Sequence, residues 1–285
     1  MNNKFIRVIP RLDIKNGMLI KGINLEGLRV LGDPYEFANY YYKNVADEIC
    51  YVDNVATLYG TNNLSKFVSR TAQNLFIPLS VGGGIRSLKD IERMLLNGAD
   101  KVIINSAAIN DKNFIYEAAK TFGSSTITVT IESVKIKNNY FISKSNGRDL
   151  VEKDPVKWAE FLEDNGAGEI FLTSVTNEGL KLGYDINVTK KISKCVNIPV
   201  IAHGGAGSFD DVFKVISQTN ISGVSMSGLL HYNSIHNIKK VAEDFKIGNY
   251  EFIKAAKKIK HKKKKTHTLK DLKKYLKLKG INVRI

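Results

Sequence analysis

Two copies of one sequence pattern, about 120 residues apart, restrict the folds open to this chain. IPLSVGGGIRS spans residues 77–87 and IPVIAHGGAGS spans 198–208; each joins a short apolar run to glycines and then to a helix-like segment. ADEIC and AGEIF repeat with a spacing of 121 residues, and Gly82 and Gly204 with a spacing of 122. A repeat of this period indicates that one supersecondary unit is built twice.

Short β-branched runs alternate with amphipathic segments along the chain, as they do in repeated β/α units. Eight such runs are typical of a closed barrel of parallel strands, and a barrel of 285 residues is routinely one domain. The predicted strands are residues 5–14, 48–55, 76–81, 100–105, 126–132, 169–174, 198–203 and 223–228. We therefore predict an α/β fold, a (β/α)8 TIM barrel built from two repeated half-barrels.

The net charge of +15 is concentrated in one segment. Residues 254–274 hold eleven lysines and one aspartate, which leaves +5 for the rest of the chain. Such a run is typical of electrostatic attachment to RNA, an acidic membrane or an acidic partner, and also of a solvated, partly disordered excursion. The chain has no signal-like or membrane-spanning apolar run, and Cys50 and Cys195 lack metal-ligand spacing. We expect a cytoplasmic protein without a metal or a cofactor.

The glycines of both repeats stand where a strand is expected to end and a helix to begin. Backbone N–H groups and a helix N-terminus converge on an anion there, and phosphate sites of barrels lie at this C-terminal face. Two such turns, one in each half, predict a ligand with a phosphate at each end; glycines that only permit tight turns are the alternative. The candidates at the strand ends are Gly82, Gly83, Gly84, Asn105, Thr173, Gly204, Gly205, Ser227 and Gly228.

Two carboxylates, Asp13 and Glu132, end the first and the fifth predicted strands, 119 residues apart. An acid and a base on opposite sides of one substrate suit the proton transfers of an amine condensation or a ring closure. A helix N-cap or a partner for Lys21 is the structural alternative. Asp53 is a third carboxylate candidate, and Lys21 could bind a phosphate. His203 could donate a proton or simply occupy space at the C-terminal end of the barrel, its mouth.

Motifs with a characteristic order cover nearly the whole chain. They are RVIPRLDIKNG, LIKGINLEGLR, GDP, FIPLSVGGGIRS, NGADKVIINSAA, GAGEIFLTS, GYD, IPVIAHGGAG and, near the C-terminus, LKDLKKYLKLKGINVR. In these motifs the chain resembles the cyclase subunit of imidazole glycerol phosphate synthase, in histidine biosynthesis. The resemblance implies a barrel that takes ammonia from a separate glutaminase subunit and passes it along the barrel axis. The ammonia joins a bisphosphorylated ribulosyl-formimino-carboxamide ribonucleotide, which yields imidazole glycerol phosphate and an aminoimidazole carboxamide ribotide.

The resemblance also implies roles for individual residues. Asp13 matches the first catalytic aspartate of the family, Lys21 its lysine at the mouth, and glycines 82–84 and 204–205 its phosphate loops. The charged ring that gates ammonia at the N-terminal end of the barrel is matched by Arg7, Glu48, Lys101 and Glu169. Ordinary stabilising electrostatics is the alternative for a ring at that end. The expected partner is the glutaminase subunit, in a heterodimer.

Several positions depart from the family pattern. The second catalytic aspartate is Glu132, which is one methylene longer, and the small residue before the second glycine turn is His203. The D-x-D-G-T stretch after the sixth strand reads TNEGL at residues 176–180, and the cysteine beside the first aspartate is Arg11. An insertion is also expected, which divides the chain into a barrel body, a lysine-rich insertion and a closing C-terminal helix at residues 1–233, 234–266 and 267–285.

Three functions are therefore weighed. The first is the cyclase subunit, with Asp13 and Glu132 as general base and acid. The second is a paralogue that keeps ammonia delivery but serves a sugar amidotransferase in the acetamidino modification of surface glycans, because the departures gather at the mouth. The third is a non-enzymatic scaffold that binds nucleic acid through its lysine run. The barrel motifs favour the first function and make nucleic acid the least expected partner.

Overall fold

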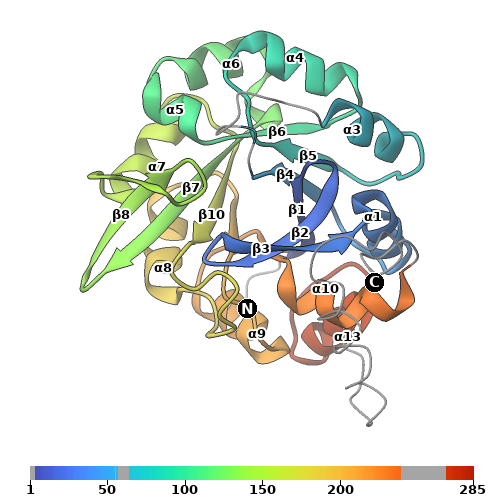
Figure 1. The fold of residues 1–285 in the computed structure, drawn as a ribbon. Coiled ribbons are helices and arrows are strands. Elements are labelled where there is room, and N and C mark those ends of the chain that lie inside the picture. Colours follow the sequence, from blue (N-terminus) through green and yellow to red (C-terminus); the bar gives the residue numbers. More distant parts are fainter. Residues whose placement is uncertain (1–3, 55, 57–63, 239–267) are drawn as a thin grey trace.

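Eight parallel strands close into a barrel in the structure of this chain, a computed structural model that describes residues 4–54, 56, 64–238 and 268–285. Each strand pairs with the next around the barrel, and β12 returns to pair with β1. The strands are β1 (Arg7–Lys15), β4 (Ile49–Asp53), β5 (Leu79–Gly82), β6 (Lys101–Ile104), β7 (Ile127–Ile136), β10 (Glu169–Ser174), β11 (Val200–His203) and β12 (Gly223–Met226). The predicted (β/α)8 barrel is thereby confirmed (Figure 1).

Helices surround the barrel and cover the outer face of its strands (Figure 1). Their sequences carry strong start signals: Ser87 with Asp90, and Ser208 with Asp211, form capping boxes at equivalent places in the two halves. The helices are α1 (Pro34–Lys43), α3 (Ser65–Ala72), α4 (Leu88–Leu96), α6 (Phe114–Phe122), α7 (Pro155–Asp164), α8 (Ile186–Cys195), α9 (Phe209–Gln218) and α13 (Leu269–Leu278), with the short α5 (Ser106–Asn110) and α10 (Gly228–Ser234) and the 3-10 turns η1 (Ser124–Thr126) and η2 (Ile235–Asn237).

The strand register shows how the two halves correspond. Asp13 lies opposite Val52 in the β1–β4 pair, and Glu132 lies opposite Thr173 in the β7–β10 pair. Val52 and Thr173 are separated by 121 residues, which is the spacing of the repeat. Asp13 and Glu132 therefore occupy equivalent positions in the two halves, as the sequence repeat predicts.

The spacing of 122 that pairs Gly82 with Gly204 is wrong by one residue. Gly83 and Gly204 have φ values of 95° and 98°, in the region that favours glycine. A Cβ on Gly83 would lie 2.3 Å from the carbonyl oxygen of Asp53, and one on Gly204 would lie 2.6 Å from that of Ser174. Both carbonyls end a neighbouring strand. Gly83 is therefore the counterpart of Gly204, while Gly82 still belongs to β5.

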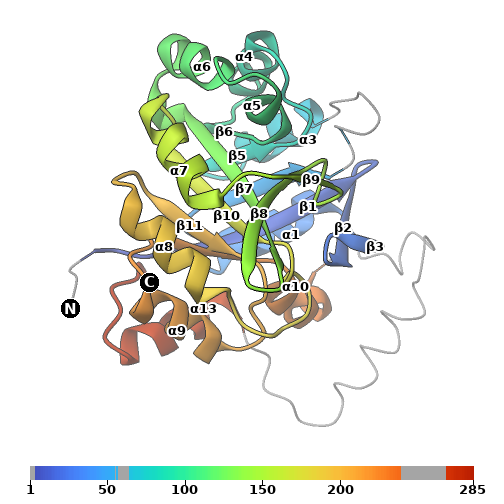
Figure 2. The same ribbon diagram turned by 90° about the vertical axis from the view of Figure 1, so that its left-hand side faces the viewer.

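Two antiparallel hairpins, absent from the predicted elements, extend the first strand of each half. β1 continues into β2 (Met18–Ile23) and β3 (Glu26–Gly32), and β7 continues into β8 (Asn139–Lys144) and β9 (Asp149–Val151) (Figure 2). The two hairpins meet: Arg148 Nε lies 2.9 Å from Glu26 Oε1, and Asn146 Nδ2 donates to the carbonyl of Leu25 at 3.3 Å. Because β1 and β7 are the first and fifth strands of the barrel, this contact crosses its C-terminal mouth.

The inside of the barrel is a packed apolar layer, as expected for eight strands. It consists of Ile9, Cys50, Ile103, Phe171 and Ile201, all buried. A second and larger core lies between the strands and the surrounding helices. Burial raises the pKa of Cys50, so this thiol stays protonated and serves as a small apolar side chain.

The C-terminal helix α13 corrects the interpretation of the lysine run. Lys273, inside that run, is fully buried; its Nζ lies 2.7 Å from Asp47 Oδ1 and donates to the carbonyl of Val45 at 2.6 Å. This lysine therefore belongs to the barrel body, neither to a solvated excursion nor to an attachment site. Residues 254–267 of the run, and the predicted insertion from 239 onward, lie outside the described residues, while α10 and η2 continue the barrel body through Asn237.

None of the helices described is both long enough and apolar enough to cross a membrane. The predicted domain boundaries stay predictions.

Candidate active site

Four charged side chains form a ring at the N-terminal end of the barrel. Arg7 contacts Glu169 and lies 2.8 Å from Glu48 (Nη1 to Oε2). Lys101 Nζ lies 3.3 Å from Glu48 Oε2 and 3.1 Å from Glu169 Oε1. Each carboxylate thus lies between two cations, and the charges alternate around the ring. The four residues predicted as an ammonia gate come together, and their role in ammonia entry stays a prediction.

At the opposite end of the barrel, Arg11 joins β1 to β10. Its Nε lies 2.9 Å from Asp13 Oδ1, and its Nη1 donates to Thr173 Oγ1 at 3.3 Å. The guanidinium carbon lies 5.8 Å from the centre of the Phe171 ring, on top of the apolar layer. Two predicted site residues, Asp13 and Thr173, are therefore brought together by a third that the family pattern does not contain. The partner of Asp13 is Arg11 rather than Lys21.

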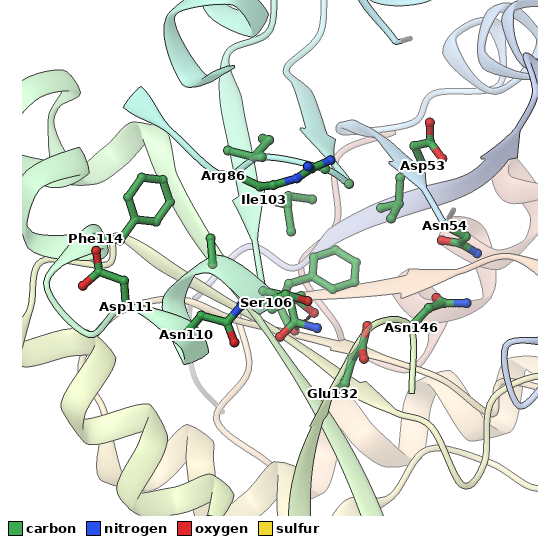
Figure 3. Close-up of a pocket in the computed structure, with 18 of the residues that line it drawn as sticks. Asp53, Asn54, Arg86, Ile103, Ser106, Asn110, Asp111, Phe114, Glu132 and Asn146 are labelled. Atoms are coloured by element: carbon green, nitrogen blue, oxygen red, sulfur yellow. Dashed lines mark hydrogen bonds between the residues drawn. The ribbon is translucent and has the colours of Figure 1, made fainter. Parts of the chain in front are cut away.

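Glu132 opens onto a cavity of about 400 Å³ in the first half of the mouth. Its Oε2 accepts a hydrogen bond from the backbone N–H of Gly147 at 2.8 Å, and Ser143 Oγ lies 3.5 Å away. Figure 3 shows Glu132 and Asn146 on one side of this cavity and Arg86 on the other. The cavity therefore has the Glu132 carboxyl group on one side and the Arg86 guanidinium on the other.

Burial raises the pKa of Glu132 to about 7, although the hydrogen bond from Gly147 and the charge of Arg11 act in the opposite direction. At neutral pH this carboxyl group is therefore close to half protonated. A group with such a pKa exchanges a proton with a substrate readily in either direction, which is the property of a general acid or base.

The first glycine turn supplies the backbone of the same cavity. Gly83, Gly84 and Asn105 line it, whereas Gly82 lies in β5; their predicted role in phosphate binding stays a prediction. Asp53 also lines the cavity, but its Oδ1 accepts a hydrogen bond from Ala56 N at 2.9 Å, so the carboxylate is engaged in the loop.

A second cavity, of about 310 Å³, lies at the glycine turn of the other half. Six predicted residues line it: Lys21, His203, Gly204, Gly205, Ser227 and Gly228. Ser227 Oγ donates to the carbonyl of Arg11 at 3.0 Å, so its hydroxyl proton is used by β1. Among the described residues, each of the two glycine turns therefore lies in the wall of a cavity, and residues of both halves complete each cavity.

Three buried ionisable side chains meet in the second cavity. Lys21 pairs with Glu178, and His203 Nε2 lies 3.5 Å from Glu178 Oε2. Burial by itself raises the pKa of Glu178. The positive charges of protonated His203 and of Lys21 outweigh burial and lower the pKa of Glu178 to about 2. Burial lowers the pKa of His203 to about 4, so the imidazole is neutral at neutral pH.

Three residues of the mouth were missing from the predicted set: Arg11, Arg86 and Glu178. Arg86 follows the first glycine turn, and its Nη2 donates to the carbonyl of Ala56 at 3.2 Å. Each of the three stands inside a recognisable motif, PRLDI, GGGIRS or TNEGL. A charged residue within or beside a glycine turn or a strand end is the signal that could have identified them.

Comparisons with known proteins identify the family of this chain. The family model described as "Histidine biosynthesis protein" matches residues 7–236. The imidazole glycerol phosphate synthase subunit HisF of Legionella pneumophila is 49% identical over 207 residues, which cover 72% of this chain and 98% of the relative. The subunit of the same name from Campylobacter concisus is 43% identical over 251 residues, 88% of this chain and 99% of the relative. The subunit of the same name from Sulfurisphaera tokodaii is 44% identical over 227 residues, which cover 79% of this chain and 91% of the relative.

The match covers all eight barrel strands and both glycine turns. The chain therefore belongs to the histidine biosynthesis protein family.

Proposed function

We propose that this chain is the cyclase subunit of imidazole glycerol phosphate synthase. It joins ammonia to a bisphosphorylated ribulosyl-formimino-carboxamide ribonucleotide and releases imidazole glycerol phosphate and an aminoimidazole carboxamide ribotide. The relatives that carry this subunit name support the reaction. The observation that carries the proposal is the pair of cavities, one at each glycine turn, on the two halves of one barrel mouth.

The two cavities suit a ligand that carries a phosphate at each end. Gly83 and Gly204 have the backbone conformation in which successive N–H groups turn toward a bound anion. Basic side chains stand beside both turns, Arg86 in the first cavity and Lys21 in the second. The reacting centre of such a ligand lies between its two phosphates. Arg11 and Glu132 line the first cavity, and Asp13 is bonded to Arg11, so these three residues are the ones that we assign to the reaction.

The two carboxylates divide the proton transfers. Condensation of ammonia with a carbonyl group expels water, which requires one group to remove a proton from nitrogen and another to protonate the leaving oxygen. Glu132, with a pKa near 7, supplies the protonated acid at neutral pH. Asp13, fixed by Arg11, acts as the base. Glu132 therefore takes the place of the family's aspartate, with one more methylene.

Ammonia enters at the opposite end of the barrel. The ring of Arg7, Glu48, Lys101 and Glu169 surrounds the axis there, below the apolar layer. Opening of one ion pair would admit a small neutral molecule, because an apolar interior favours ammonia over ammonium. A glutaminase subunit docked on this end is the source that we propose, in a heterodimer with this chain.

A paralogue that serves a sugar amidotransferase is the alternative for a barrel with an altered mouth. The departures from the family pattern at the mouth, Glu132, residues 176–180, His203 and Arg11 among them, prompted it, but the relatives named as synthase subunits give it no support.

Turnover with ammonium salt at alkaline pH tests the proposal without the glutaminase. The purified chain should convert the bisphosphate substrate to imidazole glycerol phosphate. Asp13→Asn should lower kcat by about 100-fold or more, the contribution typical of one general base, while substrate affinity stays within about tenfold. Asp154→Asn is the matched control, since it makes the same change at the N-cap of α7, where asparagine caps equally well. Unchanged turnover by Asp13→Asn would remove Asp13 from the mechanism, and no turnover by the folded parent chain would refute the assigned reaction.

A further inference from the structure

His203 is the buried group of the second cavity whose side chain the fold leaves without a hydrogen bond. Its side chain is almost fully enclosed, and neither ring nitrogen bonds to any residue in the described parts of the chain. The ring packs 5.7 Å from the Phe171 ring and stands directly before Gly204. Burial of ring nitrogens without a hydrogen bond is costly, and the nearest carboxylate oxygen, Glu178 Oε2, lies 3.5 Å from Nε2, so a group that supplies the missing bond would be stabilised at this place.

We propose that His203 takes up a proton when a phosphate group enters the second cavity, and that the resulting imidazolium donates a hydrogen bond to that phosphate. This inference rests on the proposed function, because it takes the second cavity as a phosphate site. The only covalent bond formed is the N–H bond of the imidazolium, and its proton comes from solvent. His203 thereby becomes a specificity residue for the charge state of the ligand.

The charges around His203 are nearly balanced before a ligand arrives. Glu178 and Asp13 favour its protonated form, whereas Arg11 and Lys21 oppose it. The wall of the cavity adds Arg29 and Lys181. Burial decides the outcome and lowers the pKa of His203 to about 4, which leaves the empty cavity with a neutral imidazole.

A phosphate dianion changes this balance. At the effective dielectric constant of about 20 that suits protein sites, one unit of negative charge about 4 Å away favours a positive group by a factor of about 1000. Two such units exceed the factor of about 1000 that separates a pKa near 4 from neutral pH. Lys21 and His203 both contact Glu178. Once His203 is charged, it competes with Lys21 for the Glu178 carboxylate, and the ammonium of Lys21 becomes available to the phosphate.

Proton uptake has a measurable signature in binding. Between the pKa of His203 in the free protein and its pKa in the complex, the dissociation constant should rise about tenfold for each unit of pH, beyond the titration of the phosphate itself. A neutral side chain at the same position would show only the contribution of the phosphate and of the other groups.

Isothermal titration calorimetry can count the protons. The full chain is titrated with the bisphosphate substrate, without ammonia, in two buffers of different ionisation enthalpy near pH 7. His203→Asn keeps an N–H donor near the same place but cannot take up a proton, and His203→Ser places a small side chain there. We expect the parent chain to take up close to one proton more than either variant, and its affinity to fall more steeply with rising pH.

The outcomes separate the inference from the proposed function. Equal proton uptake by the parent and His203→Asn, with both binding the bisphosphate, would overturn the role of His203 and leave the proposed function intact. Failure of the folded parent to bind the bisphosphate would instead refute the second cavity as its phosphate site. Circular dichroism of each variant shows that the barrel is folded.

Discussion

Replacement of Glu132 by glutamine should make the protein more stable and less active. The folded-state pKa of Glu132, about 7, lies above its ordinary value of 4.5. The ionised carboxylate of Glu132 therefore lowers the free energy of unfolding. This loss is absent well below pH 4.5, grows as the pH rises above 4.5, and is complete above the folded-state pKa of about 7. A shift from 4.5 to about 7 corresponds to about 3 kcal/mol at alkaline pH. Glutamine, which carries no charge, avoids this loss and can still accept the hydrogen bond from Gly147.

Urea unfolding as a function of pH measures this difference. The gain in unfolding free energy of Glu132→Gln over the parent should be below about 1 kcal/mol near pH 5 and reach about 3 kcal/mol near pH 8.5. The ammonia-dependent turnover of the variant should fall by about 100-fold or more, because glutamine cannot exchange a proton. A gain that does not change with pH would show that burial does not perturb Glu132, and the assignment of this group as the acid would lose its physical basis.

Two further predictions concern the lower part of the barrel. Asp47→Ala should lower the unfolding free energy by about 3 kcal/mol or more, because it leaves the buried ammonium of Lys273 without its carboxylate. Lys273→Met should lower the unfolding free energy much less. Equal losses of unfolding free energy in urea titrations of the two variants would contradict this account. Glu48→Gln, in the charged ring, should change glutamine-driven turnover of the complex with its glutaminase more than ammonium-driven turnover of the chain alone; equal changes would indicate that the ring only stabilises the barrel.

The barrel strands were predictable because their signal is local. β-branched runs, capping boxes and glycine turns each lie within a few residues, and the repeat places them in two matching sets. Alignment of Asp13 with Glu132 followed from the repeat and agrees with the strand register. The one-residue error at Gly82 arose because three successive glycines look alike in a sequence, while only backbone conformation distinguishes them.

The two hairpins escaped prediction for a conformational reason. The turn between β2 and β3 places Asn24 and Leu25 at φ values of 49° and 65°, and leucine is not a residue that indicates a left-handed turn. The contacts of Glu178 escaped because they link residues 157 positions apart, Lys21 and Glu178, in different halves of the barrel. No local pattern carries that pairing; it exists only once the barrel has closed.

The contact between the two hairpins ties the first strand of one half-barrel to that of the other across the mouth. The exposed ion pair of Arg148 with Glu26 and the hydrogen bond from Asn146 to the carbonyl of Leu25 contribute about 1 kcal/mol each at most, and separation of the hairpins would also uncover part of the Leu25 side chain, which is worth about 1 kcal/mol. A total of about 3 kcal/mol corresponds to about one molecule in a hundred with the hairpins apart at any moment. A ligand that could reach its site only while the hairpins are apart would therefore associate about a hundredfold more slowly than one that can enter at any time.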